Sequence, residues 1–308
     1  MLRSTAMLES VIPRVLAWVP ITWRRALIGR PGNPSRAATF VHDLLNRRPP
    51  GASQVFTCRG VLEGYRMRTD WNRFRGFVYG TWEPEVVGAL VATVKTGATA
   101  IDIGAHIGYY TLVLAKCVGP AGRIISFEPL PVNLALLRKN VQLNDLQQVQ
   151  VEAQAVFSRN EELTITVPDD APNSGEASVL PVEGAKQFRV PATTLDSFCS
   201  GTGFKPNFLK MDVEGAEYDV LLGAKETIAQ SRPKMLIELH HFDGNLAGHP
   251  VPELLASWNY EIQWIDRSRM TSHILALPKT ASSSNSAKAF PQRVLKERSL
   301  NSDQKARS

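Results

Sequence analysis

The sequence holds few of the residues that stabilise small secreted domains or structural metal sites. Its 3 cysteines are Cys58, Cys117 and Cys199, and no two of them form a C-x-x-C pair. Cysteines so few and so widely spaced argue against a disulfide framework and against a structural zinc site. The same usage is typical of a reducing compartment, so we expect a cytoplasmic protein.

A long hydrophobic run is also missing. The apolar stretch at residues 15–23 is much shorter than the roughly 20 residues of a membrane-spanning helix, and Pro20 interrupts it. Glu9 and Pro13 spoil a signal-peptide core, and no small-x-small cleavage site follows. Tryptophan beside arginine suits a membrane surface, so we expect this segment either to touch a membrane peripherally or to pack on its own domain.

Phosphate-binding loops are absent as well. The chain contains neither a G-x-x-x-x-G-K-[ST] loop nor a G-x-G-x-x-G turn, and these are the patterns that cradle nucleotide phosphates. The charge pattern argues against nucleic acid too. Residues 1–75 carry a net charge of +9 and residues 279–308 carry +5, so with +6 in total residues 76–278 carry −8. A nucleic-acid enzyme would place positive charge around its cleft, whereas here the flanks are basic and the core is acidic.

The most informative stretch is residues 99–128. Its first apolar run is broken by Asp102, as in a buried parallel strand. Gly104 and Gly108 then bracket a tight turn, and residues 109–118 have the apolar spacing of a helix. A second strand ends at Glu128, about twenty residues past the turn, where a nucleoside-binding βαβ unit places the carboxylate that binds ribose. The pattern predicts a cofactor that contains adenosine.

The residues of the turn indicate which cofactor this is. His106 stands where a pyrophosphate would need bare backbone, and Asp102 would repel phosphate but attract an ammonium or a sulfonium. S-adenosylmethionine has adenosine at one end and a positively charged amino-acid tail at the other, so it fits this arrangement. The alternative is an unliganded turn that needs glycine only for its backbone angles.

Strand-like and helix-like segments alternate along the core, which predicts an α/β fold with a doubly wound, mostly parallel sheet. We expect core strands at 99–103, 123–127, 149–155, 207–211, 234–239, 260–265 and 273–277, and helices at 84–94, 109–118 and 131–143. Before the core, Val55–Thr57 and Phe77–Tyr79 predict a hairpin. An extra strand pair at 162–167 and 188–190 flanks a polar loop at 168–175, which is either a substrate lid or an ordinary surface insertion.

Five runs of residues are diagnostic when taken together: Tyr79–Glu85, Ile101–Thr111, Phe127–Pro129, Phe208–Glu217 and Ile237–His240. They resemble the FkbM-type group of class I S-adenosylmethionine-dependent methyltransferases, over about residues 76–277. The resemblance implies a Rossmann-like sheet of seven strands whose last strand is antiparallel. It divides the chain into a basic N-terminal extension (1–53), a methyltransferase domain (54–278, with a cofactor-binding core at 97–278) and a disordered basic tail (279–308).

Candidate site residues follow the strands at 207–211 and 234–239. Ligands of open α/β sheets lie outside the carboxyl ends of the strands, so acids placed there should converge. The expected catalytic residues are Asp212, Glu214 and His240, with Asp212 the first choice as base or hydrogen-bond acceptor. The expected cofactor-binding residues are Glu83, Asp102, Gly104, His106, Gly108, Glu128 and Asp212, of which Glu83 rests on the resemblance. For Glu217, capping of the following helix is favoured over a catalytic role.

A metal ion is not supported by the sequence. Asp212, Glu214, Glu238 and His240 offer the oxygen and imidazole ligands of a divalent-metal site, but acids at strand ends are common in this fold.

The expected reaction is methyl transfer to oxygen. The chain has no [DNS]-P-P-[YFW] motif, which argues against amino-N methylation of DNA bases, and no cysteine after proline, which argues against C5 methylation of cytosine. The resemblance implies an O-methyltransferase whose small-molecule or glycan acceptor carries a hydroxyl, as sugars and specialised metabolites do. Two alternatives remain: an RNA methyltransferase tethered by the basic flanks, and a non-catalytic protein that keeps the cofactor fold. The sequence carries no signal for the oligomeric state.

Overall fold

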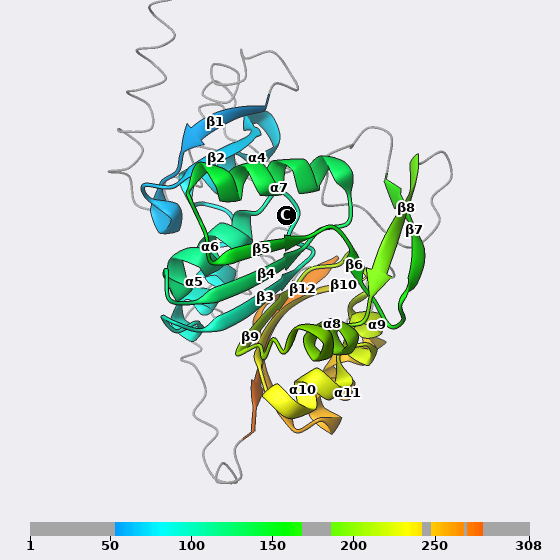
Figure 1. Cartoon of the computed structure of the whole chain (residues 1–308). Coiled ribbons are helices and arrows are strands. Elements are labelled where there is room, and N and C mark those ends of the chain that lie inside the picture. The colour runs from blue at the N-terminus through cyan, green and yellow to red at the C-terminus, as the bar shows by residue number, and fades with distance from the viewer. Residues whose placement is uncertain (1–52, 168–185, 242–247, 268–269, 280–308) are drawn as a thin grey trace, which may run out of the picture. The chain divides into compact units, whose positions relative to one another are not determined.

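Figure 1 presents the computed structural model of the chain, which describes residues 53–167, 186–241, 248–267 and 270–279. The predicted N-terminal extension, the predicted tail and the loop at 168–175 therefore fall almost wholly outside the described residues. Within the described ranges, no helix combines the length and the apolar character needed to cross a bilayer.

The main sheet has seven strands in the order β11-β12-β10-β9-β3-β4-β5. These strands are β3 (Thr99–Ile103), β4 (Arg123–Phe127), β5 (Val149–Glu152), β9 (Phe208–Met211), β10 (Lys234–His240), β11 (Tyr260–Arg267) and β12 (Thr271–Pro278). The run from β10 to β5 pairs in parallel, and β12 is antiparallel to both of its neighbours. The predicted doubly wound, mostly parallel sheet with an antiparallel last strand is confirmed.

Helices cover both faces of this sheet (Figure 1). They are α4 (Trp71–Tyr79), α5 (Pro84–Thr93), α6 (Tyr109–Val118), α7 (Pro131–Leu143), α8 (Leu195–Thr202), α9 (Glu217–Leu222), α10 (Lys225–Ser231) and α11 (Pro250–Ser257). Alternate strand residues enter different cores: Ala100 packs in the core that contains Leu112 of α6, and Ile101 in the core that contains Val220 of α9. Burial on both faces explains why the central strands are mostly apolar.

The segment before the sheet differs from the prediction. The strand expected at Phe77–Tyr79 is wrong, because these residues form the last turn of α4. Asp70 caps this helix by accepting a hydrogen bond from the backbone N–H of Asn72 at 2.8 Å, and Trp71 and Phe74 continue its buried face. A short apolar run fits a helix as well as a strand, and only the cap distinguishes them. The hairpin is instead made by β1 (Ser53–Thr57) and β2 (Arg66–Asp70), joined through a 3-10 turn (Gly60–Leu62).

A second, three-stranded sheet has the order β6-β8-β7. Its strands are β6 (Ala155–Val156), β7 (Glu161–Val167) and β8 (Lys186–Thr193), so the predicted extra strand pair is confirmed. The strand expected at 149–155 divides, because β5 ends at Glu152 and Ala155 pairs with β8 instead. A small core of Leu130, Ile165, Val167 and Val190 holds this sheet against the loop that follows β4.

Gly104 fixes how the loops after β3 and β9 approach one another. The backbone N–H of Asp212 donates to the carbonyl of Ile103 at 3.0 Å, so the hydrogen bonding between β3 and β9 continues to the first residue after β9. Gly104 has a φ of +76°, and a Cβ built on it would lie 1.8 Å from the backbone oxygen of Asp212. Only glycine therefore permits this contact.

We expect Gly104→Ala to lower the free energy of unfolding by about 2–4 kcal/mol, because it adds both backbone strain and a steric clash. Denaturant unfolding followed by circular dichroism measures the change. Gly88→Ala is the matched control, since a Cβ at this helical position meets nothing within 4 Å and alanine favours a helix by up to about 1 kcal/mol. Equal stability of the two variants would contradict the argument.

Candidate active site

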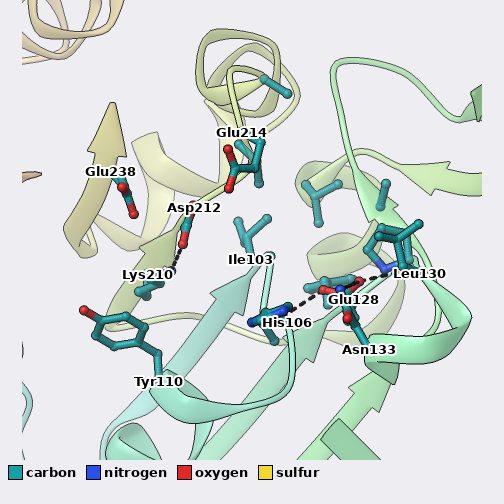
Figure 2. Close-up of a pocket in the computed structure, with 18 of the residues that line it drawn as sticks. Ile103, His106, Tyr110, Glu128, Leu130, Asn133, Lys210, Asp212, Glu214 and Glu238 are labelled. Atoms are coloured by element: carbon teal, nitrogen blue, oxygen red, sulfur yellow. Dashed lines mark hydrogen bonds and ion pairs between the residues drawn. The ribbon is translucent and has the colours of Figure 1, made fainter. Parts of the chain in front are cut away.

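A cavity of about 340 Å³ lies at the carboxyl ends of β3, β4 and β9, within the size range of small-molecule sites. Figure 2 shows acids at both ends of it, with Ile103 at the end of β3 between them. Glu128 lies at one end, and Asp212, Glu214 and Glu238 lie at the other. The wall between is largely apolar and comes from α4, from the turn after β3 and from the second sheet.

Most of the predicted site residues meet in this cavity. Those that line it are Glu83, Gly104, His106, Glu128, Asp212 and Glu214. Asp102, Gly108 and His240 are not among the described residues that line it. Gly108 instead begins α6, whereas Asp102 and His240 lie behind lining residues, as their contacts below establish.

Glu128 is held rigidly by backbone donors. Its Oε2 accepts a hydrogen bond from the N–H of His106 at 2.8 Å, and its Oε1 accepts one from the N–H of Leu130 at 2.9 Å (Figure 2). Burial raises the pKa of Glu128 to about 7, although both N–H donors favour the ionised form. Each carboxylate oxygen has a second lone pair, so Glu128 can still accept hydrogen bonds from a ligand's hydroxyls.

Asp102 lies beneath the glycine turn and is fully buried. Its Oδ2 accepts a hydrogen bond from the hydroxyl of Thr111 in α6 at 2.6 Å. Burial raises its pKa, and the neighbouring charge of Lys210 opposes that rise. These contacts anchor β3 to α6, and direct cofactor binding by Asp102 stays a prediction.

Asp212 is paired with a buried lysine. The ammonium of Lys210 lies 3.1 Å from Oδ2 of Asp212 and 4.6 Å from the centre of the Tyr110 ring. Although burial alone would raise the pKa of Asp212, the charges of Lys210 and then of His240 hold it below its usual value. Asp212 is therefore an ionised hydrogen-bond acceptor near neutral pH and a weak base.

Glu214 and His240 form a second pair at the end of the cavity that holds Asp212, Glu214 and Glu238, called the acid-rich end below. The imidazole Nδ1 of His240 lies 2.8 Å from Oε1 of Glu217, and its Nε2 lies 3.1 Å from Oε2 of Glu214. These two carboxylates raise the pKa of His240 above its usual value, against the effect of burial. Burial raises the pKa of Glu214 to about 7, and the hydrogen bond with His240 opposes the rise. Glu217 is the first residue of α9, and its Oε1 also accepts a hydrogen bond from the N–H of Gly215 at 2.9 Å. Its carboxylate thus contacts both His240 and the loop before α9.

Glu83 lies directly before α5 with a φ of 38°, in the left-handed region that glutamate rarely adopts. It accepts a hydrogen bond from the hydroxyl of Tyr110, and burial raises its pKa to about 7. Its Oε2 also lies 3.7 Å from Nε2 of His273 in β12. Glu83 thus belongs to the acid-rich end. The contact with the amino-acid end of the cofactor, which the resemblance implies for Glu83, stays a prediction.

His273 and Asp266 are the residues that sequence reasoning missed. His273 lies directly across the antiparallel β10–β12 pair from Glu238, and Nε2 is 3.3 Å from Oε2 of Glu238. Asp266 in β11 accepts from Nδ1 of His273, with the two atoms 2.9 Å apart. No local motif marks these residues, because only the register of three strands brings them together. The one available signal was a histidine in an otherwise apolar closing strand.

Carboxylates therefore face the cavity, and each is close to a cationic side chain. Glu83, Asp212, Glu214 and Glu238 line the wall together with Lys210, whereas His240 and His273 lie behind it, and all three cationic side chains are nearly buried. Such a wall accepts hydrogen bonds from hydroxyl or amine groups and repels phosphate. A carboxylate with a pKa near 7 can also take up a proton at neutral pH.

Comparisons with known proteins show the family of the chain. Residues 102–262, just over half of the chain, match the family described as "Methyltransferase FkbM domain". Methyltransferase 1 of Beauveria bassiana is 24% identical over 178 residues, which cover 51% of this chain and 70% of that protein. The AMB antimetabolite synthetase AmbE of Pseudomonas aeruginosa is 27% identical over 207 residues, which are 54% of this chain but 10% of the synthetase.

Among solved structures, the methyltransferase FkbM from Methylobacillus flagellatus KT is 21% identical with a TM-score of 0.42. That match covers 64% of this chain and about half, 51%, of the solved chain. Glu83, Asp266 and His273 all lie outside the 102–262 span of the family match.

Glu128 should make stability depend on pH in a defined window. Its pKa is about 7 in the native state, against an ordinary value of 4.5, so its proton stabilises the native state fully below pH 4.5. That contribution is lost as pH rises toward 7. We expect Glu128→Gln to show a smaller fall in the free energy of unfolding between pH 4.5 and 7 than the wild type, in denaturant titrations at a series of pH values. Above pH 8 the two curves should run parallel, and equal falls within the window would contradict the assignment.

Proposed function

Because the chain belongs to the FkbM methyltransferase family, we propose that it transfers a methyl group from S-adenosylmethionine to a hydroxyl of a sugar, a glycan or a specialised metabolite. The observation that carries the proposal is a single cavity with Glu128 at one end and a base-competent carboxylate, Glu214, at the other.

The cofactor half of the cavity fits an adenosyl group. Glu128 offers lone pairs to ribose hydroxyls, and Leu130, Val156 and Ile165 supply an apolar wall for a purine base. The turn from Gly104 to His106 would bind the amino-acid end, close to the acids that suit an ammonium. When bound, S-adenosylmethionine supplies a methyl group on a positively charged sulfur. The chain's own residues then have to bring the acceptor oxygen into line with that methyl group.

The acid-rich half fits a hydroxyl acceptor. Methylation of oxygen requires that the hydroxyl proton leave, and a positioned base contributes about 10²–10⁴-fold to such steps. Glu214 is the base in this proposal, because its pKa near 7 leaves it partly ionised at neutral pH. Asp212 stays ionised beside Lys210 and would accept the hydroxyl's hydrogen bond while the acceptor is aligned. His240 supports the Glu214 anion from behind.

The alternatives fit the cavity less well. A nucleic-acid acceptor would bring phosphates toward four carboxylates, which electrostatics disfavours. A non-catalytic role would leave the raised pKa values of Glu83 and Glu214 without a purpose. We also propose a cytoplasmic location, which the three free cysteines support.

Calorimetric titration of the purified full chain with S-adenosylhomocysteine, the demethylated product, tests the cofactor half. We expect binding in the micromolar range, weakened about tenfold or more in Glu128→Ala, because a charged hydrogen-bond acceptor is lost. Glu214→Gln is the matched control and should bind within about threefold of the wild type. Folded wild-type protein that binds no S-adenosylhomocysteine would favour the non-catalytic alternative.

A second measurement follows transfer of labelled methyl groups to a panel of glycans, hydroxylated metabolites and RNA. Labelling confined to hydroxyl-bearing small molecules or glycans supports the proposal. Labelling of RNA alone would replace it with the RNA alternative.

The proton acceptor gives a kinetic prediction. With the acceptor identified in that panel, kcat of the wild type should rise with pH through about 7, because Glu214 must lose its proton before it can act as a base. The charged groups that act on Glu214 are His240, with Nε2 at 3.1 Å from Oε2, and the acids Asp212 and Glu238. We expect Glu214→Gln to lower kcat by about 100-fold or more and to abolish this rise. An unchanged pH profile in the variant would assign the base to another residue.

A further inference from the structure

His273 is held in an orientation that metal-binding imidazoles share. Its Nδ1 lies 2.9 Å from Oδ1 of Asp266, and the same oxygen accepts the backbone N–H of His273 at 3.1 Å. The imidazole is 95% buried, since its exposed fraction is 5%. Histidines that bind metals usually direct one ring nitrogen to a carboxylate and present the other to the ion. Here the second nitrogen, Nε2, faces two further carboxylates.

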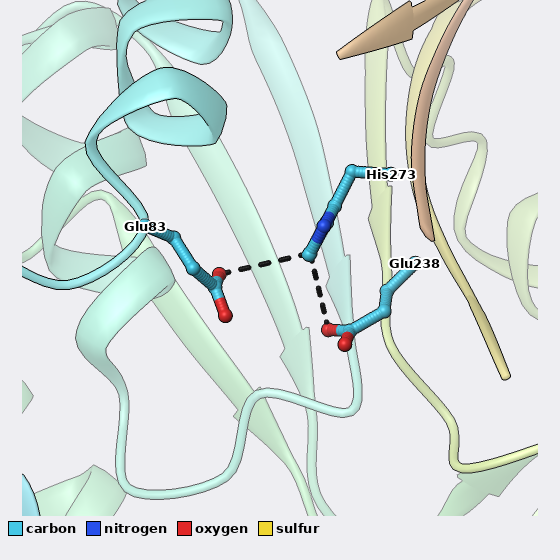
Figure 3. Close-up of side chains that lie close together, drawn as sticks. All are labelled: Glu83, Glu238 and His273. Carbon is cyan, nitrogen blue, oxygen red and sulfur yellow. Dashed lines mark ion pairs between the residues drawn. The ribbon is translucent and has the colours of Figure 1, made fainter. Parts of the chain in front are cut away.

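Figure 3 shows the carboxylates of Glu83 and Glu238 both converging on Nε2 of His273. The distances from Nε2 are 3.3 Å to Glu238 Oε2 and 3.7 Å to Glu83 Oε2. A cation about 2.1 Å from each of three ligands in tetrahedral geometry separates those ligands by about 3.4 Å. The two distances from Nε2 are thus close to the separation expected for ligands of one ion, and the ligand atoms of all three residues lie within 4.8 Å of one another.

The three ligands also come from rigid supports. Glu238 and His273 face each other across paired strands, and Glu83 is fixed by the hydroxyl of Tyr110. Glu83 and Glu238 line the cavity, so a fourth position on the ion would open toward a ligand there. Three protein ligands with one open position is the pattern of a catalytic zinc site.

The neighbouring group of Asp212, Glu238 and His240 is a weaker candidate, although its ligand atoms are equally close. Lys210 already pairs with Asp212 at 3.1 Å and would repel a cation. Nε2 of His240 is occupied by Glu214 at 3.1 Å.

We propose that Glu83, Glu238 and His273 bind one divalent first-row transition cation at the acid-rich end of the cavity. One imidazole with two carboxylates favours Zn²⁺ over Mg²⁺, which prefers oxygen ligands and its own water shell. This site stands on its own geometry and does not depend on the proposed methyl transfer, because it can be measured without a methyl donor.

The test is calorimetric titration of the chelator-treated full chain with Zn²⁺, and separately with Mg²⁺. We expect one saturable Zn²⁺ per chain and weaker Mg²⁺ binding. His273→Gln and Glu83→Gln should each weaken Zn²⁺ binding about tenfold or more, and Asp266→Asn should weaken it through loss of the imidazole's orientation. His240→Gln, the matched control, should bind within about threefold of the wild type.

Three outcomes would overturn the proposal: no saturable Zn²⁺ binding to wild type, binding that survives both His273→Gln and Glu83→Gln, or loss in His240→Gln alone. Far-UV circular dichroism checks the fold of each variant, and if His273→Gln fails to fold, Glu83→Gln decides the question. Titration with S-adenosylhomocysteine on the same samples separates a failed metal site from a failed cofactor site.

Discussion

The site depends on one buried cation. Lys210 lies in β9 directly across from Asp102 in β3, and its ammonium is 3.1 Å from Asp212. Its side chain is only 3% exposed, and a charge buried so deeply persists only when it is paired. The ring of Tyr110 adds a cation–π contact. Without Lys210, the repulsion between Asp102 and Asp212 would be unopposed, and the pKa of both carboxyls would rise.

The same arrangement repeats with the two histidines. His240 lies behind Glu214 and Glu217, and His273 lies behind Glu83 and Glu238. In both cases positive charge stands on the protein side of a carboxylate whose other face borders the cavity. The carboxylates can therefore remain close together with less mutual repulsion, and their lone pairs are available to a ligand in the cavity.

Elements that depend on local pattern were predictable from the sequence, and elements that depend on register were not. The alternation of strands and helices predicted the sheet, and the position of acids at strand ends predicted Asp212 and Glu214 as site residues. Both signals can be read within a few residues of the sequence. The segment Phe77–Tyr79 was wrongly predicted as a strand, since its apolar run fits either element. His273 was not predicted as a site residue, because its partners come from β10 and β11 and the pairing of strands cannot be inferred from the sequence of a single segment.

The acid-rich end is encoded partly outside residues 102–262, the span of the family match. Glu128 and Asp212 lie within residues 102–262, whereas Glu83, Asp266 and His273 lie outside that span. Mutations at these three positions can change the chemistry at one end of the cavity without altering any residue of the matched span. Two homologues that match the family equally well can thus diverge at positions 83, 266 and 273. An acceptor found for one member therefore transfers to another only after these three positions have been compared.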